Sequence, residues 1–167
     1  MKQAKQATSH ILCTSTKVVD GEPYLLRVTR RHPHNRLRTT LFPEGEVLDG
    51  EMLLETLIRV TNDVLAGDGF KISSSKEIHG IYDRESGKFC HFVLFEFSGE
   101  LRAERIDPTT SPGPYIIDPP AFERVKSLYF SIDRTQRDIL VDVVERLAID
   151  NPSFAKGFKD ITRRPLA

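Results

Sequence analysis

The sequence predicts a mixed α/β domain, because strand-like and helix-like segments alternate along its 167 residues. Residues 11–17 and 24–29 are rich in β-branched and aromatic types, and residues 89–97 form a third run of this kind. Between residues 50 and 66, leucine, isoleucine and valine recur at the spacing of an α-helix. A second amphipathic helical pattern follows Asp133. We therefore expect a β-sheet covered by helices.

The composition favours one soluble domain. A hydrophobic content of 39% is enough for a single core, so we expect a flexible N-terminus at 1–10, one domain at 11–150 and a basic, weakly patterned tail at 151–167. Because 24 basic residues balance 24 acidic ones, no nucleic-acid partner is expected. The sequence shows neither an apolar stretch of about 18 residues nor a secretory signal pattern, so we expect a cytoplasmic protein without membrane contact. Cys13 and Cys90 lie in apolar runs, which favours buried, reduced thiols.

The strands and the first helix can be placed from turn and capping signals. Asp20-Gly21 is a strong turn pair, so the first two strand-like runs should form a hairpin. Asp49 is the expected N-cap of the first helix. Both faces of the 89–97 run are mostly apolar, which predicts a central strand, and residues 78–82 are its expected hairpin partner.

The C-terminal half contains a proline-rich segment between residues 107 and 120. Five prolines in this segment predict an ordered loop, and such a loop can act as a lid. Asp118 followed by Pro119 is expected to start a short helix. Asp133 with Gln136 resembles a capping box in front of the last long helix.

One segment, residues 27–38, is strongly basic and contains no acidic residue. Such a segment is typical of a solvated loop, or of a guanidinium cluster that binds phosphate or carboxylate groups of a ligand. Its basic side chains are Arg27, Arg30, Arg31, Arg36 and Arg38, with His32 and His34.

The segment from Phe42 to Glu51 and the helix after it resemble the Nudix box. The pattern of that family is Gly-x5-Glu-x7-Arg-Glu-hydrophobic-x-Glu-Glu-x-Gly-hydrophobic, and Gly45, Glu51 and Arg59 match its first three fixed positions. The resemblance extends over residues 11 to about 149. It implies a Nudix-type α/β/α sandwich with a mixed β-sheet and, in ordinary members, Mg²⁺ bound on the diphosphate of the substrate.

The chain departs from the family pattern at the glutamates that bind the metal. Val60, Asp63 and Val64 stand at these three positions, so two of the three carboxylates are absent. No cofactor is therefore assigned, and only Asp63 remains as a metal ligand if Mg²⁺ is used. The first glutamate of the box has a structural role in the family, so we expect Glu51 and Arg59 to form an ion pair.

Three functions remain open from the sequence, and whether the protein is an enzyme is itself open. The first is a metal-independent enzyme of the isomerase or cyclase type, acting on a small organic molecule in a biosynthetic pathway. The second is a residual metal-dependent hydrolase of a nucleoside diphosphate derivative or another diphosphate ester. The third is a non-catalytic, Nudix-like binding module. The expected partner is a small molecule, and a homodimer is an open arrangement.

Candidate site residues follow from the first of these functions. Asp63, as general acid or base, His91 and Glu96 are the catalytic candidates. The alternative interpretation of His91 is a core histidine, and that of the two valines is ordinary core packing. The candidates for substrate binding are Arg36, Arg38, Val60, Val64 and Tyr115.

Overall fold

The computed structural model describes residues 9–34, 37–84, 87–108 and 114–162. No helix among these residues is both long and apolar enough to span a membrane. The elements, in chain order, are β1 (Ser9–Thr14), β2 (Thr16–Val19), β3 (Glu22–Arg31), β4 (Arg38–Leu41), β5 (Glu44–Glu46), α1 (Leu53–Val64), β6 (Lys71–Asp83), β7 (Lys88–Ser98), β8 (Ile116–Arg124), α2 (Val125–Ser131), α3 (Arg134–Asp150) and α4 (Pro152–Thr162).

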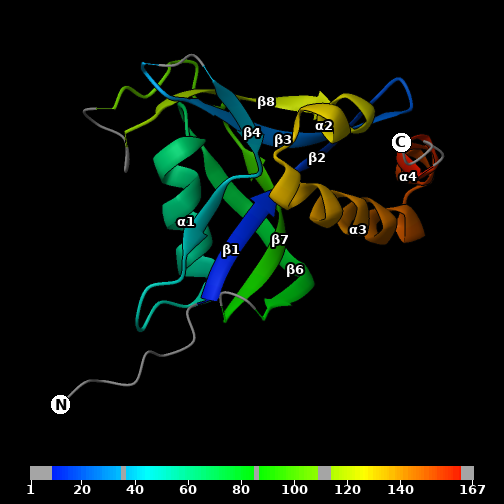
Figure 1. Ribbon diagram of the computed structural model, residues 1–167, viewed down its shortest axis with the longest axis horizontal. Coiled ribbons are helices and arrows are strands. Elements are labelled where there is room, and N and C mark those ends of the chain that lie inside the picture. The colour runs from blue at the N-terminus through cyan, green and yellow to red at the C-terminus, as the bar shows by residue number, and fades with distance from the viewer. Residues whose placement is uncertain (1–8, 35–36, 85–86, 109–113, 163–167) are drawn as a thin grey trace.

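The strands form two sheets. The first has the order β5-β1-β7-β6, and it is mixed because β1 runs parallel to β7 while the other pairs are antiparallel. The second is antiparallel, and β3 pairs with β2, β4 and β8. Helices α1 and α3 lie on opposite sides of the first sheet (Figure 1). This arrangement is the predicted α/β/α sandwich with a mixed sheet, and β7 is the predicted central strand.

The strand-like run at residues 11–17 is two strands in two different sheets. Ser15 separates β1 from β2, and its carbonyl accepts the N–H of Leu26 at 3.0 Å. The chain therefore crosses from the first sheet to the second at this residue. The predicted hairpin is present between β2 and β3, where Asp20 and Gly21 have φ of 52° and 76°. A turn with two positive φ values is the kind that an Asp-Gly pair favours.

Helix α1 begins at Leu53, and its N-cap is Met52, so the expectation of Asp49 as the cap is wrong. Residues 48–51 form a tight turn, in which the N–H of Glu51 donates to the carbonyl of Leu48 at 3.0 Å. This turn places Asp49 before the first helical turn, too far from the free N–H groups that a cap must reach.

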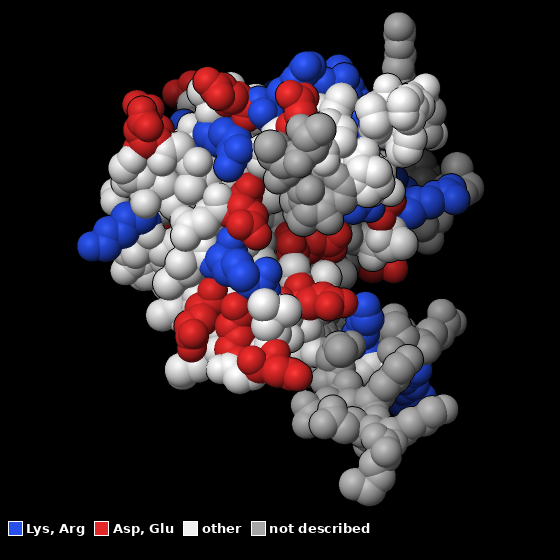
Figure 2. Space-filling model, turned by 90° about the vertical axis from the view of Figure 1, so that its left-hand side faces the viewer, with Lys and Arg blue, Asp and Glu red and all other residues white. Residues whose placement is uncertain are grey.

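Acidic and basic side chains are interspersed on the α1 side of the molecule (Figure 2).

The prolines that were expected to start a helix lie in strand β8 instead. Pro119 and Pro120 are part of Ile116–Arg124, and the helix begins only at Val125. Proline is tolerated here because β3 is the one described strand that pairs with β8, and the bridge on the other edge of β8 joins Ile106 to Ile117, before the two prolines. The pairing register shifts opposite Arg27 to Thr29, where the two prolines are accommodated.

The C-terminal region differs from the expectation at two places. The side chain of Asp133 makes no capping hydrogen bond to α3, and Gln136 instead accepts the backbone N–H of Phe42. Residues 152–162, expected in a weakly patterned tail, form helix α4. Phe154 and Ile161 of this helix are buried, because they share one apolar face at a spacing of seven residues.

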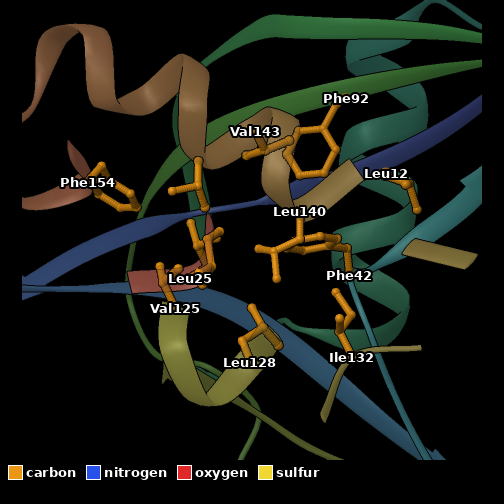
Figure 3. Packing of buried hydrophobic residues seen from close by; sticks show 12 residues of the cluster. Leu12, Leu25, Phe42, Phe92, Val125, Leu128, Ile132, Leu140, Val143 and Phe154 are labelled. Atoms are coloured by element: carbon orange, nitrogen blue, oxygen red, sulfur yellow. The ribbon is translucent and has the colours of Figure 1, made fainter. Parts of the chain in front are cut away.

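The core consists of two clusters on the two sides of the first sheet. Leu12 of β1 and Phe92 of β7 point into the cluster formed with α2, α3 and α4 (Figure 3). Their neighbours Ile11 and Val93 belong to the second cluster, under α1. Alternating side chains of one strand therefore supply both clusters, as expected for a central strand. The cysteines are free thiols, one buried in β1 and one half-buried in β7.

Candidate functional site

The expected ion pair of the box is present. Arg59 Nε and Nη2 donate to the two carboxylate oxygens of Glu51 at 3.0 and 3.1 Å, and the hydroxyl of Thr56 donates to the same carboxylate at 2.7 Å. The Arg59 guanidinium and Thr56 lower the pKa of Glu51 to about 2, and Glu51 raises the pKa of Arg59. Arg59 also donates to the carbonyl of Glu46, so the pair ties α1 to the end of β5.

Val60 lies on the face of α1 that packs against Gly45 of β5. Its side chain is only 3% exposed and belongs to the core cluster under α1. A Cβ built on Gly45 would lie 2.5 Å from Cγ2 of Val60, so the valine fills the space beside this glycine. Val64 is half-buried and packs against the same cluster. Val60 is therefore a core residue, in line with the alternative interpretation of core packing, and Val64 lies at the edge of the same cluster.

The remaining carboxylate of the box, Asp63, does not form a metal centre. It is exposed at the end of α1, and its backbone carbonyl accepts a hydrogen bond from Arg102 at 3.3 Å. Within the described ranges, no group of three or more His, Cys, Asp or Glu side chains is arranged to hold a metal ion. Mg²⁺ prefers a set of oxygen ligands, and with Val60 and Val64 at two of the three metal-binding positions only one carboxylate remains there. The donors present at the box therefore do not fit Mg²⁺.

The three catalytic candidates are not brought together. His91 Nδ1 lies 2.6 Å from Glu77 of the neighbouring strand, whereas Glu96 accepts a hydrogen bond from Ser74. His91 and Glu96 lie five residues apart in β7, so they project from opposite faces about 17 Å apart. Asp63 belongs to α1, and its backbone carbonyl accepts a hydrogen bond from Arg102.

Of the substrate-binding candidates, Tyr115 lies beside the basic segment. The guanidinium of Arg30 stacks over the Tyr115 ring at 4.7 Å from the centroid, and the His32 ring meets the same tyrosine edge-on at 6.1 Å. Arg38 is exposed at the start of β4. Arg36 lies outside the described residues.

A polar cluster that the sequence did not reveal lies next to this stacked arginine. We call it the Glu44 cluster; it consists of His10, Arg30, Glu44 and Gln136. Oε2 of Glu44 lies 3.2 Å from His10 Nε2 and accepts the side-chain amide of Gln136 at 3.3 Å. Oε1 of Glu44 lies 3.9 Å from Arg30 Nη1. The cluster therefore joins β1, β3, β5 and α3 at one point.

Strand register explains why this cluster faces α3 and not α1. Glu44 lies opposite Leu12, whose side chain enters the cluster with α3, and Gly45 lies opposite Ile11, whose side chain enters the cluster under α1. Successive residues of a strand point to opposite faces. Glu44 and Gly45 are adjacent in the sequence but therefore face opposite sides of the sheet.

A groove of about 580 Å³ runs between the first sheet and the N-terminal half of α3, with His10 in its wall. Cys90 also lines it, but burial and then the nearby Glu44 raise the pKa of this thiol to about 11, so it is not a nucleophile at neutral pH. The other residues that line the groove are Ile81, Tyr82, Arg84, Lys88, Thr135, Asp138, Ile139 and Asp142.

The Glu44 cluster was missed because its members are distant in sequence. His10 and Glu44 are 34 positions apart, and Gln136 is a further 92 away. The available signal was Glu44 itself, a carboxylate directly before the first glycine of the box. Its partner could not be predicted, because the antiparallel pairing of β1 with the three-residue strand β5 has no sequence signature.

Comparisons with known proteins agree on the fold. No protein-family model matches the sequence, and no curated protein matches it. Among solved structures, the chain is similar to a MutT protein from work on Aliivibrio salmonicida and Vibrio cholerae, with 11% identity, a TM-score of 0.58, and coverage of 84% of this chain and 99% of that one. It is similar to a Nudix hydrolase from Nitrosomonas europaea, with 14% identity, a TM-score of 0.53, and coverage of 87% and 91%. It is also similar to the Nudix domain of Shewanella oneidensis NrtR, solved with ADP ribose, with 12% identity, a TM-score of 0.54, and coverage of 86% and 90%.

These similarities show that the chain has the Nudix fold, as the box resemblance predicted. The fold is a scaffold on which different sites can be built, so the function is argued from the residues of this chain.

Proposed function

We propose that this protein binds a small, nucleotide-derived ligand in the groove beside α3, without a metal ion held by the box helix. The observation that carries the proposal is the position of Val60. A buried valine fills the space beside Gly45, where the family pattern would place a metal-binding glutamate. On the other side of the sheet, the Glu44 cluster and the groove next to it present accessible polar groups.

The groove has the properties of a small-molecule site. It is concave, it joins sheet residues with helix residues, and its wall mixes apolar side chains with a few charged ones. Arg84 and Lys88 line it together with Asp138 and Asp142, so the wall offers groups for both charged and uncharged parts of a ligand. The nucleotide class is supported by the similar Nudix domain that was solved with ADP ribose.

A metal-independent enzyme, of the isomerase or cyclase type suggested by the sequence, is the second candidate. The contact between His10 and Glu44 favours it, because an imidazole beside a carboxylate is a common acid–base pair and His10 lies in the groove wall. Diphosphate hydrolysis with box-held Mg²⁺ lacks such support, since its ligands are not assembled.

Isothermal titration calorimetry tests the proposal. ADP-ribose, AMP, GMP and IMP are titrated into the protein with EDTA and with Mg²⁺, and ³¹P NMR records any product. We expect at least one ligand to bind equally well in EDTA. Thr135→Trp, which fills the groove from an exposed position, should weaken this binding by about tenfold or more. Ser127→Trp, an exposed serine of α2 outside the groove, is the matched control and should bind normally.

Two results would oppose the proposal. Binding or hydrolysis that requires Mg²⁺ and is lost in Asp63→Asn would restore the hydrolase interpretation. Binding of none of the four ligands would refute the nucleotide-derived class.

A further inference from the structure

The Glu44 cluster presents one hydrogen-bond acceptor beside one donor. Oε2 of Glu44 is occupied by His10 and Gln136, whereas among the described residues Oε1 has only Arg30 Nη1 as a polar neighbour, at 3.9 Å. This separation is longer than a hydrogen bond. The side chains of Glu44 and Arg30 are 32% and 38% exposed, so a ligand can reach both. The acceptor Glu44 Oε1 and the donor Arg30 Nη1 thus lie side by side without a hydrogen bond between them.

Neighbouring residues hold this pair in place. The N–H of Phe42 donates to Gln136 Oε1 at 2.8 Å, which fixes the amide so that its NH₂ points to Glu44. The Arg30 guanidinium lies over the Tyr115 ring, 4.7 Å from its centroid, and this contact restrains its position. Such a pair is preorganised, because little side-chain freedom is lost when a ligand binds.

The charges of the cluster do not suit a phosphate group. Glu44 lies beside both Arg30 and His10, and Arg31 donates from Nε to both oxygens of Asp118 at 3.1 and 3.2 Å. A phosphate placed here would meet the carboxylate of Glu44 as well as the guanidinium. Two buried nitrogens, His10 Nδ1 and Arg30 Nε, have no hydrogen-bond partner among the described residues, so the cluster has polar capacity that the fold does not use.

We infer that Glu44 and Arg30 recognise an uncharged edge in which an N–H stands beside a carbonyl, as in the lactam of hypoxanthine or guanine. This inference rests on the function proposed above. Glu44 Oε1 accepts the ligand N–H, and Arg30 donates to the ligand carbonyl. The cluster therefore selects the base of a nucleotide-derived ligand and not its phosphates, in contrast to the guanidinium–phosphate role that the basic segment suggested.

The test compares two ligands that differ by one donor. IMP carries the N1–H beside its carbonyl, whereas 1-methyl-IMP has a methyl group in its place. Calorimetry with the wild-type protein should show that N1-methylation weakens binding by about tenfold or more, because a carboxylate is left without its donor. Glu44→Gln should reduce this discrimination to about threefold or less, since the bond to a charged acceptor is lost.

Glu123→Gln is the matched control. Glu123 is a half-buried carboxylate of β8 that pairs with Arg27 at 3.7 Å, and its replacement should leave the discrimination unchanged. Circular dichroism verifies that each variant is folded, and the comparison of the two ligands stands without any variant.

The outcomes separate the inference from the proposed function. Equal binding of IMP and 1-methyl-IMP by the wild-type protein would overturn the inference and leave the proposed function intact. Full discrimination in a folded Glu44→Gln would also overturn it. Failure of ADP-ribose, AMP, GMP and IMP alike would overturn the proposed function, and this inference with it.

Discussion

Placing a methyl group on Gly45 tests whether Val60 fills the space beside the box glycine. In Gly45→Ala the new Cβ would lie 2.5 Å from Val60 Cγ2, whereas carbon atoms normally approach to about 3.5–4.0 Å. Overpacking of this kind costs about 1–3 kcal/mol, and the smaller entropy of the unfolded alanine chain offsets only about 0.4–1 kcal/mol. We therefore expect a loss of about 1–2 kcal/mol in the free energy of unfolding.

In a Val60→Ala background, Gly45→Ala should no longer destabilise the protein. Val60→Ala deletes two buried methyl groups at about 0.8 kcal/mol each and leaves a cavity, so it should cost about 2–3 kcal/mol alone. In that background the atom nearest to the new Cβ, after the loss of Cγ2, is Val60 Cβ at 3.8 Å, an ordinary contact. Gly45→Ala should then be neutral or slightly stabilising, which gives a coupling energy of about 2 kcal/mol.

Urea unfolding followed by far-UV circular dichroism measures the cycle, because the protein contains no tryptophan. Val144→Ala is the matched control, since Val144 is a fully buried valine of the other core cluster. Gly45→Ala and Val144→Ala should add to within about 0.5 kcal/mol. Additivity between Gly45→Ala and Val60→Ala would show that the two residues do not share this space, and would remove the main support for a closed box face.

Three further results are expected from other contacts. Because the pKa of Glu51 is lowered from 4.5 to about 2, its pair with Arg59 stabilises the fold above pH 4.5 and loses this contribution as the pH falls toward 2. The difference in unfolding free energy between wild type and Glu51→Gln should therefore shrink over that range, and a constant difference would contradict the pairing. Gln136→Ala should cost about 1–3 kcal/mol in urea unfolding, because the buried N–H of Phe42 loses its acceptor; an unchanged midpoint would argue against that bond. Iodoacetamide should alkylate Cys90 at pH 8 about 100-fold more slowly in the folded protein than in urea, as its pKa of about 11 against 9.0 requires, and fast labelling of the folded form would show that the thiol is not shielded.

The sequence was most informative where local pattern and tertiary packing agree. Leu57 and Val60 of the α1 stripe enter the core as their spacing predicts, although Leu54 and Ile58 at its margin are exposed. The Asp20-Gly21 turn joins the two strands expected on either side of it. Glu51 and Arg59 form the ion pair that their positions in the box imply. Each of these features depends on residues that are close together in the sequence, so a short window contains the whole signal.

The sequence was least informative where pairing between distant segments decides the structure. Pro119 is a helix starter by local statistics, but its place on the free edge of β8 makes a strand acceptable. Gln136 matches a capping box locally, but the buried N–H of Phe42 needs an acceptor more than the helix end does. His10 had no local signal at all, and its role became apparent only when β1 paired with β5.

Helix α4 has a consequence for how the protein must fold. Phe154 and Ile161 share one core cluster with Leu12, so the first strand and the last helix complete the same apolar interior. Nearly the whole chain has to be looped out before this cluster can close, and such distant contacts form slowly. During synthesis on the ribosome, Leu12 and Phe92 therefore cannot be fully buried until α4 has emerged. A chain that stalls before residue 152 would leave this apolar surface exposed to chaperones and to aggregation.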